Sequence, residues 1–229
     1  MRDLLGLAER KKSRLILALD FVSGDPAVFA DRLLAALEPL VVGVKVGLPL
    51  ALRMGFRGVC ELVERYGSGY YFLADFKLAD IPDVVREELA LLSEAGFDGS
   101  IVHLFPMGLE EALSGVRGHD VFGLVAMSHA GSRLLDEHFE DLLRYASRLG
   151  IRGVVAPATK PGLVARARAF LPEDYLILSP GVGAQGAEPG SALRHGATFE
   201  IVGRSITASE DYYGAAERVV ESQRRVIGE

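Results

Sequence analysis

The densest group of residues able to do acid–base chemistry is the stretch Asp75-Phe-Lys77-Leu-Ala-Asp80. Side chains alternate between the two faces of a strand, so Asp75 and Lys77 are expected on the same face. Nearby carboxylates keep a lysine protonated, and a protonated lysine can act as a general acid. The group therefore predicts an acid–base site, or alternatively a structural ion pair in a polar layer of the core.

Two more charged residues belong to neighbouring apolar segments. Lys45 lies between Gly43 and Gly47, which leave room for its side chain to reach the same region. Asp20 ends the first apolar segment, where it either contributes to the site or caps the helix that follows. A pair of unit charges about 4 Å apart contributes on the order of 4 kcal/mol at an effective dielectric constant of 20. Such an array predicts ionised aspartates and a protonated Lys77.

Two glycine-rich segments suggest a site for an anion. Residues 179–186 read SPGVGAQG and residues 201–205 read IVGRS. Glycines let backbone N–H groups approach phosphate oxygens closely, and Arg204 offers a planar guanidinium group that matches them. Either segment alone is equally consistent with simple turns, but together they predict a phosphorylated ligand.

Short apolar segments rich in β-forming residues predict the strands that position these groups. They are residues 14–19, 41–47, 70–76, 99–105, 121–127, 153–158, 175–181 and 199–203. Most are nearly continuous in hydrophobicity, as is typical of parallel strands covered by helices. The candidate chemical groups fall at or near the C-terminal ends of these segments.

Segments with helical periodicity alternate with the strands, among them residues 26–40, 82–96 and 136–150. Eight such repeats predict an α/β protein with a single (β/α)8 TIM barrel over residues 1–229, with 1–13 as a short N-terminal helical extension. Active sites of such barrels lie at the C-terminal strand ends. An open doubly wound sheet is less favoured, because no strand precedes a complete G-x-G-x-x-G motif.

Composition narrows the classes of function. The 31 acidic residues exceed the 25 basic ones, and this net charge of −6 disfavours nucleic-acid or membrane partners. One cysteine, Cys60, rules out an intrachain disulfide and fits a reducing compartment, so we expect a cytoplasmic protein. The N-terminus lacks the features of a signal peptide, and no apolar stretch has the length of a membrane span. The histidines lack metal-ligand spacing, so no metal site is predicted.

These motifs resemble the orotidine 5'-monophosphate decarboxylase family, especially its short archaeal form. The similarity runs through LILALD, KVGLPL, ADFKLADIP, VHLFP, MSHAG, SPGVGAQG and IVGRSI, in that order. The D-x-K-x-x-D motif alone is shared with a wider suprafamily of sugar-phosphate decarboxylases and aldolases. Its combination with Asp20, Lys45, Ser128, Gln185 and Arg204 is more specific. The resemblance implies conversion of orotidine 5'-monophosphate to uridine 5'-monophosphate in pyrimidine synthesis, with no metal or organic cofactor.

The resemblance also implies catalytic roles. Lys77 would protonate C6 of the pyrimidine as carbon dioxide leaves, and Asp75 would lie beside the substrate carboxylate. Lys45 would bridge Asp75 and the ribose. Asp80 and Ile81 would enter the site of a neighbouring subunit, which makes the expected active form a homodimer.

The same resemblance implies a set of residues that bind the substrate. Contacts to the ribose, base and phosphate would come from Asp20, Ser128, Pro180, Gly181, Gln185, Gly186, Gly203 and Arg204. Gln185 would link the phosphate to the base as its loop closes. The apolar pocket for the departing carboxylate would be formed by Leu73, Ile101 and Val155, together with Pro180.

Two alternative functions remain open at the level of the sequence. A magnesium-dependent decarboxylase or aldolase of the same suprafamily would need an acidic residue near the end of the second strand, where this chain has Lys45. A catalytically silent nucleotide-binding barrel would not require the charged array. The chain departs from the archaeal pattern at Val84 and Ala158, which stand in place of a threonine and a serine.

Overall fold

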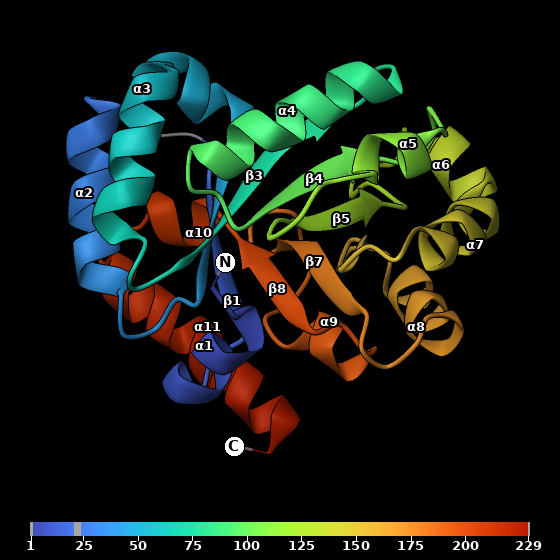
Figure 1. Cartoon of the computed structure of the whole chain (residues 1–229). Coiled ribbons are helices and arrows are strands. Elements are labelled where there is room, and N and C mark those ends of the chain that lie inside the picture. The colour runs from blue at the N-terminus through green and yellow to red at the C-terminus, as the bar shows by residue number, and fades with distance from the viewer. Residues whose placement is uncertain (1, 21–23, 229) are drawn as a thin grey trace.

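In the computed structural model, eight parallel strands close into a barrel within the described residues, 2–20 and 24–228. The strands are joined in sequence order, and β8 pairs with β1 to complete the ring. Figure 1 shows the helices arranged around these strands. The predicted (β/α)8 barrel is therefore confirmed. The two ends of the predicted domain, Met1 and Glu229, lie outside the described residues.

The strands lie close to the predicted apolar segments. Their bounds are β1 Leu15–Leu19, β2 Gly43–Gly47, β3 Tyr71–Leu78, β4 Gly99–His103, β5 Asp120–Leu124, β6 Gly153–Val155, β7 Leu176–Val182 and β8 Phe199–Val202. Four of them, β1, β2, β6 and β8, are buried along their whole length, because helices cover the outer face and side chains fill the interior. Their C-terminal ends form one mouth of the barrel.

The helices are α1 Leu4–Lys11, α2 Pro26–Leu37, α3 Leu48–Tyr66, α4 Pro82–Glu94, α5 Leu109–Leu113, α6 Arg133–Glu137, α7 Phe139–Leu149, α8 Pro161–Phe170, α9 Ser191–Arg194, α10 Arg204–Thr207 and α11 Tyr212–Ile227. Within residues 2–20 and 24–228, none of them has the length and hydropathy needed to cross a membrane. Proline occupies the first turn of α2 and α4, where its missing N–H costs no helical hydrogen bond.

One segment predicted to be a single helix is divided into two helices in the structure. Residues 136–150 were expected to form a single helix, but the chain leaves the helical conformation at His138 (φ −99°, ψ 17°) and α7 starts afresh at Phe139. Leu135 and Phe139 are both buried and lie four residues apart, so the apolar pattern continues across the break. Periodicity alone therefore cannot reveal it.

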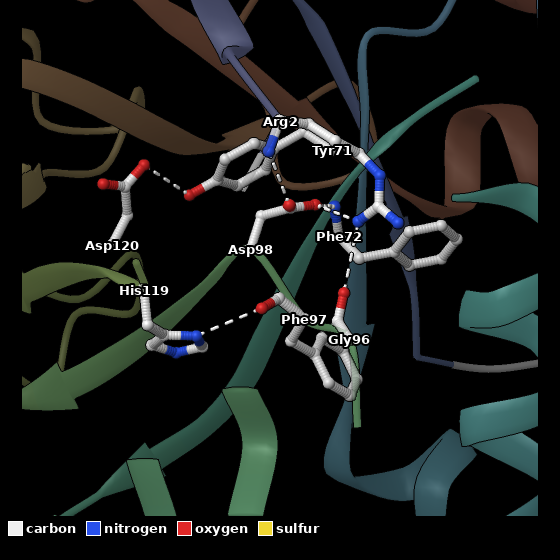
Figure 2. Close-up of polar contacts among 8 residues, drawn as sticks. All are labelled: Arg2, Tyr71, Phe72, Gly96, Phe97, Asp98, His119 and Asp120. Atoms are coloured by element: carbon white, nitrogen blue, oxygen red, sulfur yellow. Dashed lines mark hydrogen bonds and ion pairs between the residues drawn. The ribbon is translucent and has the colours of Figure 1, made fainter. Parts of the chain in front are cut away.

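The end of the barrel opposite the mouth is closed by α1 and by buried polar contacts. Leu4 and Leu7 pack into the inner core, and Arg2 donates from its backbone N–H and its guanidinium group to Asp98 (2.9 and 2.6 Å). Asp98 also accepts the N–H of Phe72 at 2.9 Å. Figure 2 shows this network at the start of the strands. The open end that remains is the one where barrel active sites lie.

Candidate active site

Strand β3 carries Asp75 and Lys77 through an irregular segment at the mouth. Ala74 pairs with Ser100 and Leu78 with Val102, so four steps along β3 oppose two along β4. Inside this bulge Lys77 has a φ of 51°, an uncommon backbone conformation for a residue other than glycine. Its Nζ lies 2.7 Å from Oδ1 of Asp75. The two charges are adjacent as expected, but in a strained bulge and not in a regular strand.

Lys45 and Asp20 extend this contact into a row of alternating charges. Lys45 Nζ lies 2.8 Å from Asp75 Oδ2 and 2.8 Å from Asp20 Oδ1. The side chains of Lys45 and Asp75 are only 7% and 9% exposed. A Cβ on Gly47 would lie 1.8 Å from Asp20 Oδ1, so the glycine leaves the space that this carboxylate occupies. Asp20, Lys45, Asp75 and Lys77 are called the charged array below.

Burial and charge act in opposite directions on the array. Burial lowers the pKa of Lys45, but the charges and hydrogen bonds of Asp75 and Asp20 outweigh it and leave that pKa raised. Burial alone would raise the pKa of Asp75, and the two lysines bring it below its ordinary value. Lys45 is therefore protonated and Asp75 ionised at neutral pH.

The stability that Asp75 contributes is expected to disappear in acid. Its pKa is lower in the folded protein than the ordinary value of 3.8, so its contribution is full above that value and is lost as the pH falls through the folded-state pKa. We expect the difference in free energy of unfolding between the wild type and Asp75→Asn to shrink below about pH 4. Urea denaturation from about pH 6 to about pH 2.5 measures it, and a difference that stays constant over this range would contradict the expectation.

A cavity of about 350 Å³ opens beside the charged array. Besides the four residues of the array, the predicted site residues that line it are Ile101, Ser128, Val155, Pro180, Gly181, Gln185, Gly203 and Arg204. The charged groups, the apolar wall and both glycine-rich segments therefore face one space. Its lining combines a charged wall, an apolar wall and an arginine, which suits a ligand with a polar ring and an anionic group.

The two glycine-rich segments meet on one side of the cavity. Gly181 and Gly183 have φ values of 103° and 76°, which L-residues with a side chain rarely adopt. A Cβ on Gly183 would lie 2.4 Å from Oγ of Ser205, at the start of α10. Because glycine occupies this position, the loop after β7 approaches the segment that carries Gly203 and Arg204.

Ser128 lies in the connection that follows β5. The residue at the start of α6 is Ser132, so Ser128 does not cap that helix. The hydroxyl group of Thr159 donates to the Ser128 carbonyl at 3.1 Å, which fixes the backbone of Ser128 at the edge of the cavity. The backbone that carries the Ser128 hydroxyl group is therefore fixed by a hydrogen bond.

Four predicted site residues lie outside the cavity lining, and Leu73 and Gly186 are two of them. Leu73 was expected in the apolar pocket, but it is fully buried in the inner core. It precedes Asp75 by two residues on β3 and so belongs to the layer beneath the cavity. Gly186 lies exposed at the tip of the loop after β7. The two departures from the archaeal pattern, Val84 and Ala158, also lie outside the lining.

Asp80 and Ile81 do not line the cavity of their own chain. They lie in the connection between β3 and α4, where Asp80 accepts the N–H of Ile81 at 2.7 Å. Asp80 borders a separate surface hollow with Leu48 and Phe56, and Ile81 is 63% exposed. One chain therefore presents both residues outward.

Several lining residues are not among the predicted site residues. They are Ala18, Leu124, Ala126, Met127, Val182, Ala184, Ile201 and Thr207. Thr207 follows Arg204 by three residues on α10, so a helical periodicity of three to four could have found it. The others are mostly apolar and resemble core residues. In the described part of the chain, no three His, Cys, Asp or Glu side chains are placed to hold a metal ion.

Comparison with known proteins agrees with these motifs. The Orotidine 5'-phosphate decarboxylase / HUMPS family matches residues 13–219. The orotidine 5'-phosphate decarboxylase of Aeropyrum pernix is 41% identical, over 91% of this chain and 87% of the relative. That of Methanococcoides burtonii is 39% identical, over 92% and 97%. The crystal structure of the Metallosphaera sedula enzyme has a TM-score of 0.80 and 38% identity, over 93% and 99%. The chain therefore belongs to the orotidine 5'-phosphate decarboxylase / HUMPS family.

Proposed function

We propose that the protein decarboxylates orotidine 5'-monophosphate (orotidylate) to uridine 5'-monophosphate (uridylate) in pyrimidine synthesis. The observation that carries the proposal is that the charged array and both glycine-rich segments line a single cavity. The relatives that match over most of the chain are orotidine 5'-phosphate decarboxylases, which supports the same reaction here.

The reaction breaks the bond between C6 of the pyrimidine and its carboxylate and releases carbon dioxide. The electron pair left on C6 takes a proton from the ammonium group of Lys77, which recovers a proton from water. Asp75 lies beside the substrate carboxylate and repels it, whereas neutral carbon dioxide feels no such repulsion. Lys45 keeps Asp75 ionised and, with Asp20, contacts the ribose. No step needs a metal ion or an organic cofactor.

The other lining residues orient the nucleotide. Ser128 contacts the pyrimidine edge, and Ile101, Val155 and Pro180 form the apolar pocket into which the carboxylate departs. Gly203, Arg204 and the backbone of Gly181 and Gly186 hold the phosphate, and Gln185 connects the phosphate with the base. The phosphate lies far from the reacting carbon C6, and its binding can order the loop that carries Gln185 and exclude water from the site. Phosphate binding is therefore expected to raise the rate as well as the affinity.

The reaction is tested by adding orotidylate to purified protein that has been treated with a chelator. We expect the ultraviolet absorbance of orotidylate to fall, with one carbon dioxide and one uridylate formed per substrate. Turnover that requires added magnesium would instead support the metal-dependent alternative. Tight binding of uridylate without any turnover of orotidylate would support a silent nucleotide-binding barrel.

Arg204→Ala is expected to weaken uridylate binding about tenfold to a hundredfold, because it removes charge-assisted hydrogen bonds to the phosphate. The affinity for uridine, which lacks the phosphate, should stay unchanged. Calorimetric titration of both ligands measures the two effects. Arg194→Ala is the control, since Arg194 is an exposed arginine of α9 outside the cavity lining. Equal losses for uridylate and uridine would reject the phosphate role.

We also propose that the active form is a homodimer in which Asp80 and Ile81 reach the partner's cavity. In their own chain both residues are exposed, and Asp80 borders a hollow that the exposed apolar side chains of Leu48, Phe56 and Leu91 line. A contiguous apolar surface of this kind is typical of an interface.

A mixture of two inactive variants tests the shared site. Each variant alone lacks a residue that every site needs. In a dimer of one Lys77→Ala chain and one Asp80→Ala chain, one of the two sites has Lys77 from one chain and Asp80 from the other. Random mixing should therefore restore about a quarter of the wild-type activity. If Asp80 acts within its own chain, mixing restores nothing. Full activity of a monomer would equally contradict the proposal.

We further propose a single-domain cytoplasmic enzyme with no nucleic-acid or membrane partner. The net charge of −6 and the lone Cys60 support this assignment. Fractionation of the cells that express the protein tests the location.

A further inference from the structure

A fully buried carboxylate on β8, three residues before Gly203, has no part in the proposed mechanism. Glu200 of β8 is 0% exposed. Its neighbours Phe199 and Ile201 point into the barrel interior, so Glu200 points outward, toward α9 and α11. Burying a carboxylate is costly unless hydrogen bonds compensate, so its partners are informative.

In the described part of the chain, the hydrogen bonds of the Glu200 side chain are all bonds that it accepts. Oε2 accepts the N–H of Gly190 at 2.8 Å and the side-chain amide of Gln223 at 3.1 Å, and Oε1 accepts the N–H of Ala192 at 3.1 Å. Gln223 is itself 0% exposed, and its Oε1 accepts the N–H of Arg14 at 3.1 Å. Burial leaves the pKa of Glu200 above its ordinary value, and these donors, which favour the ionised form, offset only part of that effect.

These contacts fix the far end of the loop that carries Gln185. At its near end the loop is joined to β7 by the hydrogen bond from Ala187 N–H to Gly181 O (3.3 Å), and the bond from Gly183 N–H to Ala187 O (2.8 Å) closes the turn beside it. At its far end Gly190 lies against α11, where a Cβ would be 2.9 Å from Cγ2 of Val226. Between these points the tip at residues 184–186 is exposed. Residues 181–190 are called the phosphate loop below.

We infer that Glu200 is a positioning residue for the phosphate site, an inference that rests on the proposed decarboxylation. It holds Gly190, the far end of the phosphate loop, to the same strand that leads into Gly203 and Arg204. The two halves of the phosphate site are thereby kept at a fixed spacing while the tip of the loop closes. A movement of about 1 Å in such a support can cost a large part of the rate.

Glu200→Gln tests this role with almost no change in volume. It replaces one accepting oxygen with an NH2 group that faces backbone donors. We expect kcat/KM for orotidylate to fall about tenfold or more, because hydrogen bonds to a charged group are lost. For orotidine, which lacks the phosphate, kcat/KM should stay within about twofold. A purely structural role would lower kcat/KM for both substrates, so a loss confined to orotidylate distinguishes the positioning role from it.

Asp98→Asn is the matched control. Asp98 is 2% exposed and also accepts a backbone N–H (Figure 2). It directly precedes β4 and so lies at the closed end of the barrel, away from the mouth. We expect Asp98→Asn to lower the melting temperature and to change kcat/KM for orotidylate and for orotidine by about the same factor. The inference would be overturned if Glu200→Gln lowered kcat/KM equally for both substrates. It would also be overturned if Asp98→Asn lowered kcat/KM for orotidylate alone.

These experiments also distinguish a failure of this inference from a failure of the proposed function. If the wild-type protein does not convert orotidylate, both the proposed decarboxylation and the role of Glu200 are rejected. A wild-type chain that is active, with a folded Glu200→Gln variant of unchanged kinetics, removes only the role of Glu200. If Glu200→Gln does not fold, Gln223→Leu removes one donor to Oε2 and should give a smaller loss that is also confined to orotidylate. Unchanged kinetics in that variant would likewise reject the role.

Discussion

Lys77→Ala is expected to reduce the decarboxylation of orotidylate by at least about 10⁴-fold while uridylate binding stays nearly unchanged. The side chain of Lys77 is 35% exposed at the cavity and contacts Asp75 at 2.7 Å. Lys45 cannot replace it, because its ammonium group is buried between two carboxylates, each at 2.8 Å. Loss of Lys77 therefore removes both the proton donor and the positive charge next to C6. Initial rates and calorimetric titration with uridylate measure the two effects.

Lys11→Ala is the control for this variant. Lys11 is also a partly buried lysine, 10% exposed and 3.4 Å from Glu38, but it belongs to α1 at the closed end of the barrel. Its loss should affect stability and leave turnover close to that of the wild type. Turnover by Lys77→Ala within about tenfold of the wild type would rule out Lys77 as the general acid.

Asp75→Asn is expected to lower kcat roughly 10³-fold without raising KM for orotidylate. The substitution keeps the shape of the side chain but removes the charge that lies between Lys45 and Lys77. A neutral amide no longer repels the substrate carboxylate, so the substrate should bind at least as tightly as before. Steady-state kinetics separate kcat from KM directly.

Asp20→Asn serves as the comparison for Asp75→Asn. Asp20 contacts Lys45 at the outer end of the array and is 33% exposed, so water can compensate for its lost charge. We expect a smaller loss in kcat and a rise in KM, because its proposed contact is to the ribose. A rise in KM with an unchanged kcat in Asp75→Asn would show that Asp75 only binds the substrate.

The strands could be predicted because a short apolar segment rich in β-forming residues is a local property of the sequence. Segments such as residues 14–19 and 199–203 need no knowledge of distant residues to be recognised. The bulge at Lys77 could not be predicted, because it depends on how β3 pairs with β4. The break at His138 was hidden for a related reason, since buried residues on both sides keep the helical spacing.

The polar part of the site was predictable because its residue types and their places at strand ends carry chemical information. The array and Arg204 are examples, and the structure brings both to one cavity. The apolar lining could not be predicted in the same way, because residues such as Leu124 and Ala126 are of the types that fill any core. Leu73 was predicted to line the apolar pocket and lies in the inner core instead, because the depth of a residue along β3 depends on the barrel and not on the residue type.

A crystal structure of the protein with bound uridylate would show whether Lys77 is placed to protonate the pyrimidine. We expect the phosphate at Gly203 and Arg204, and C6 of the pyrimidine at about 3 Å from Nζ of Lys77. A pyrimidine ring bound outside the cavity, or a Lys77 amine directed away from C6, would contradict this placement.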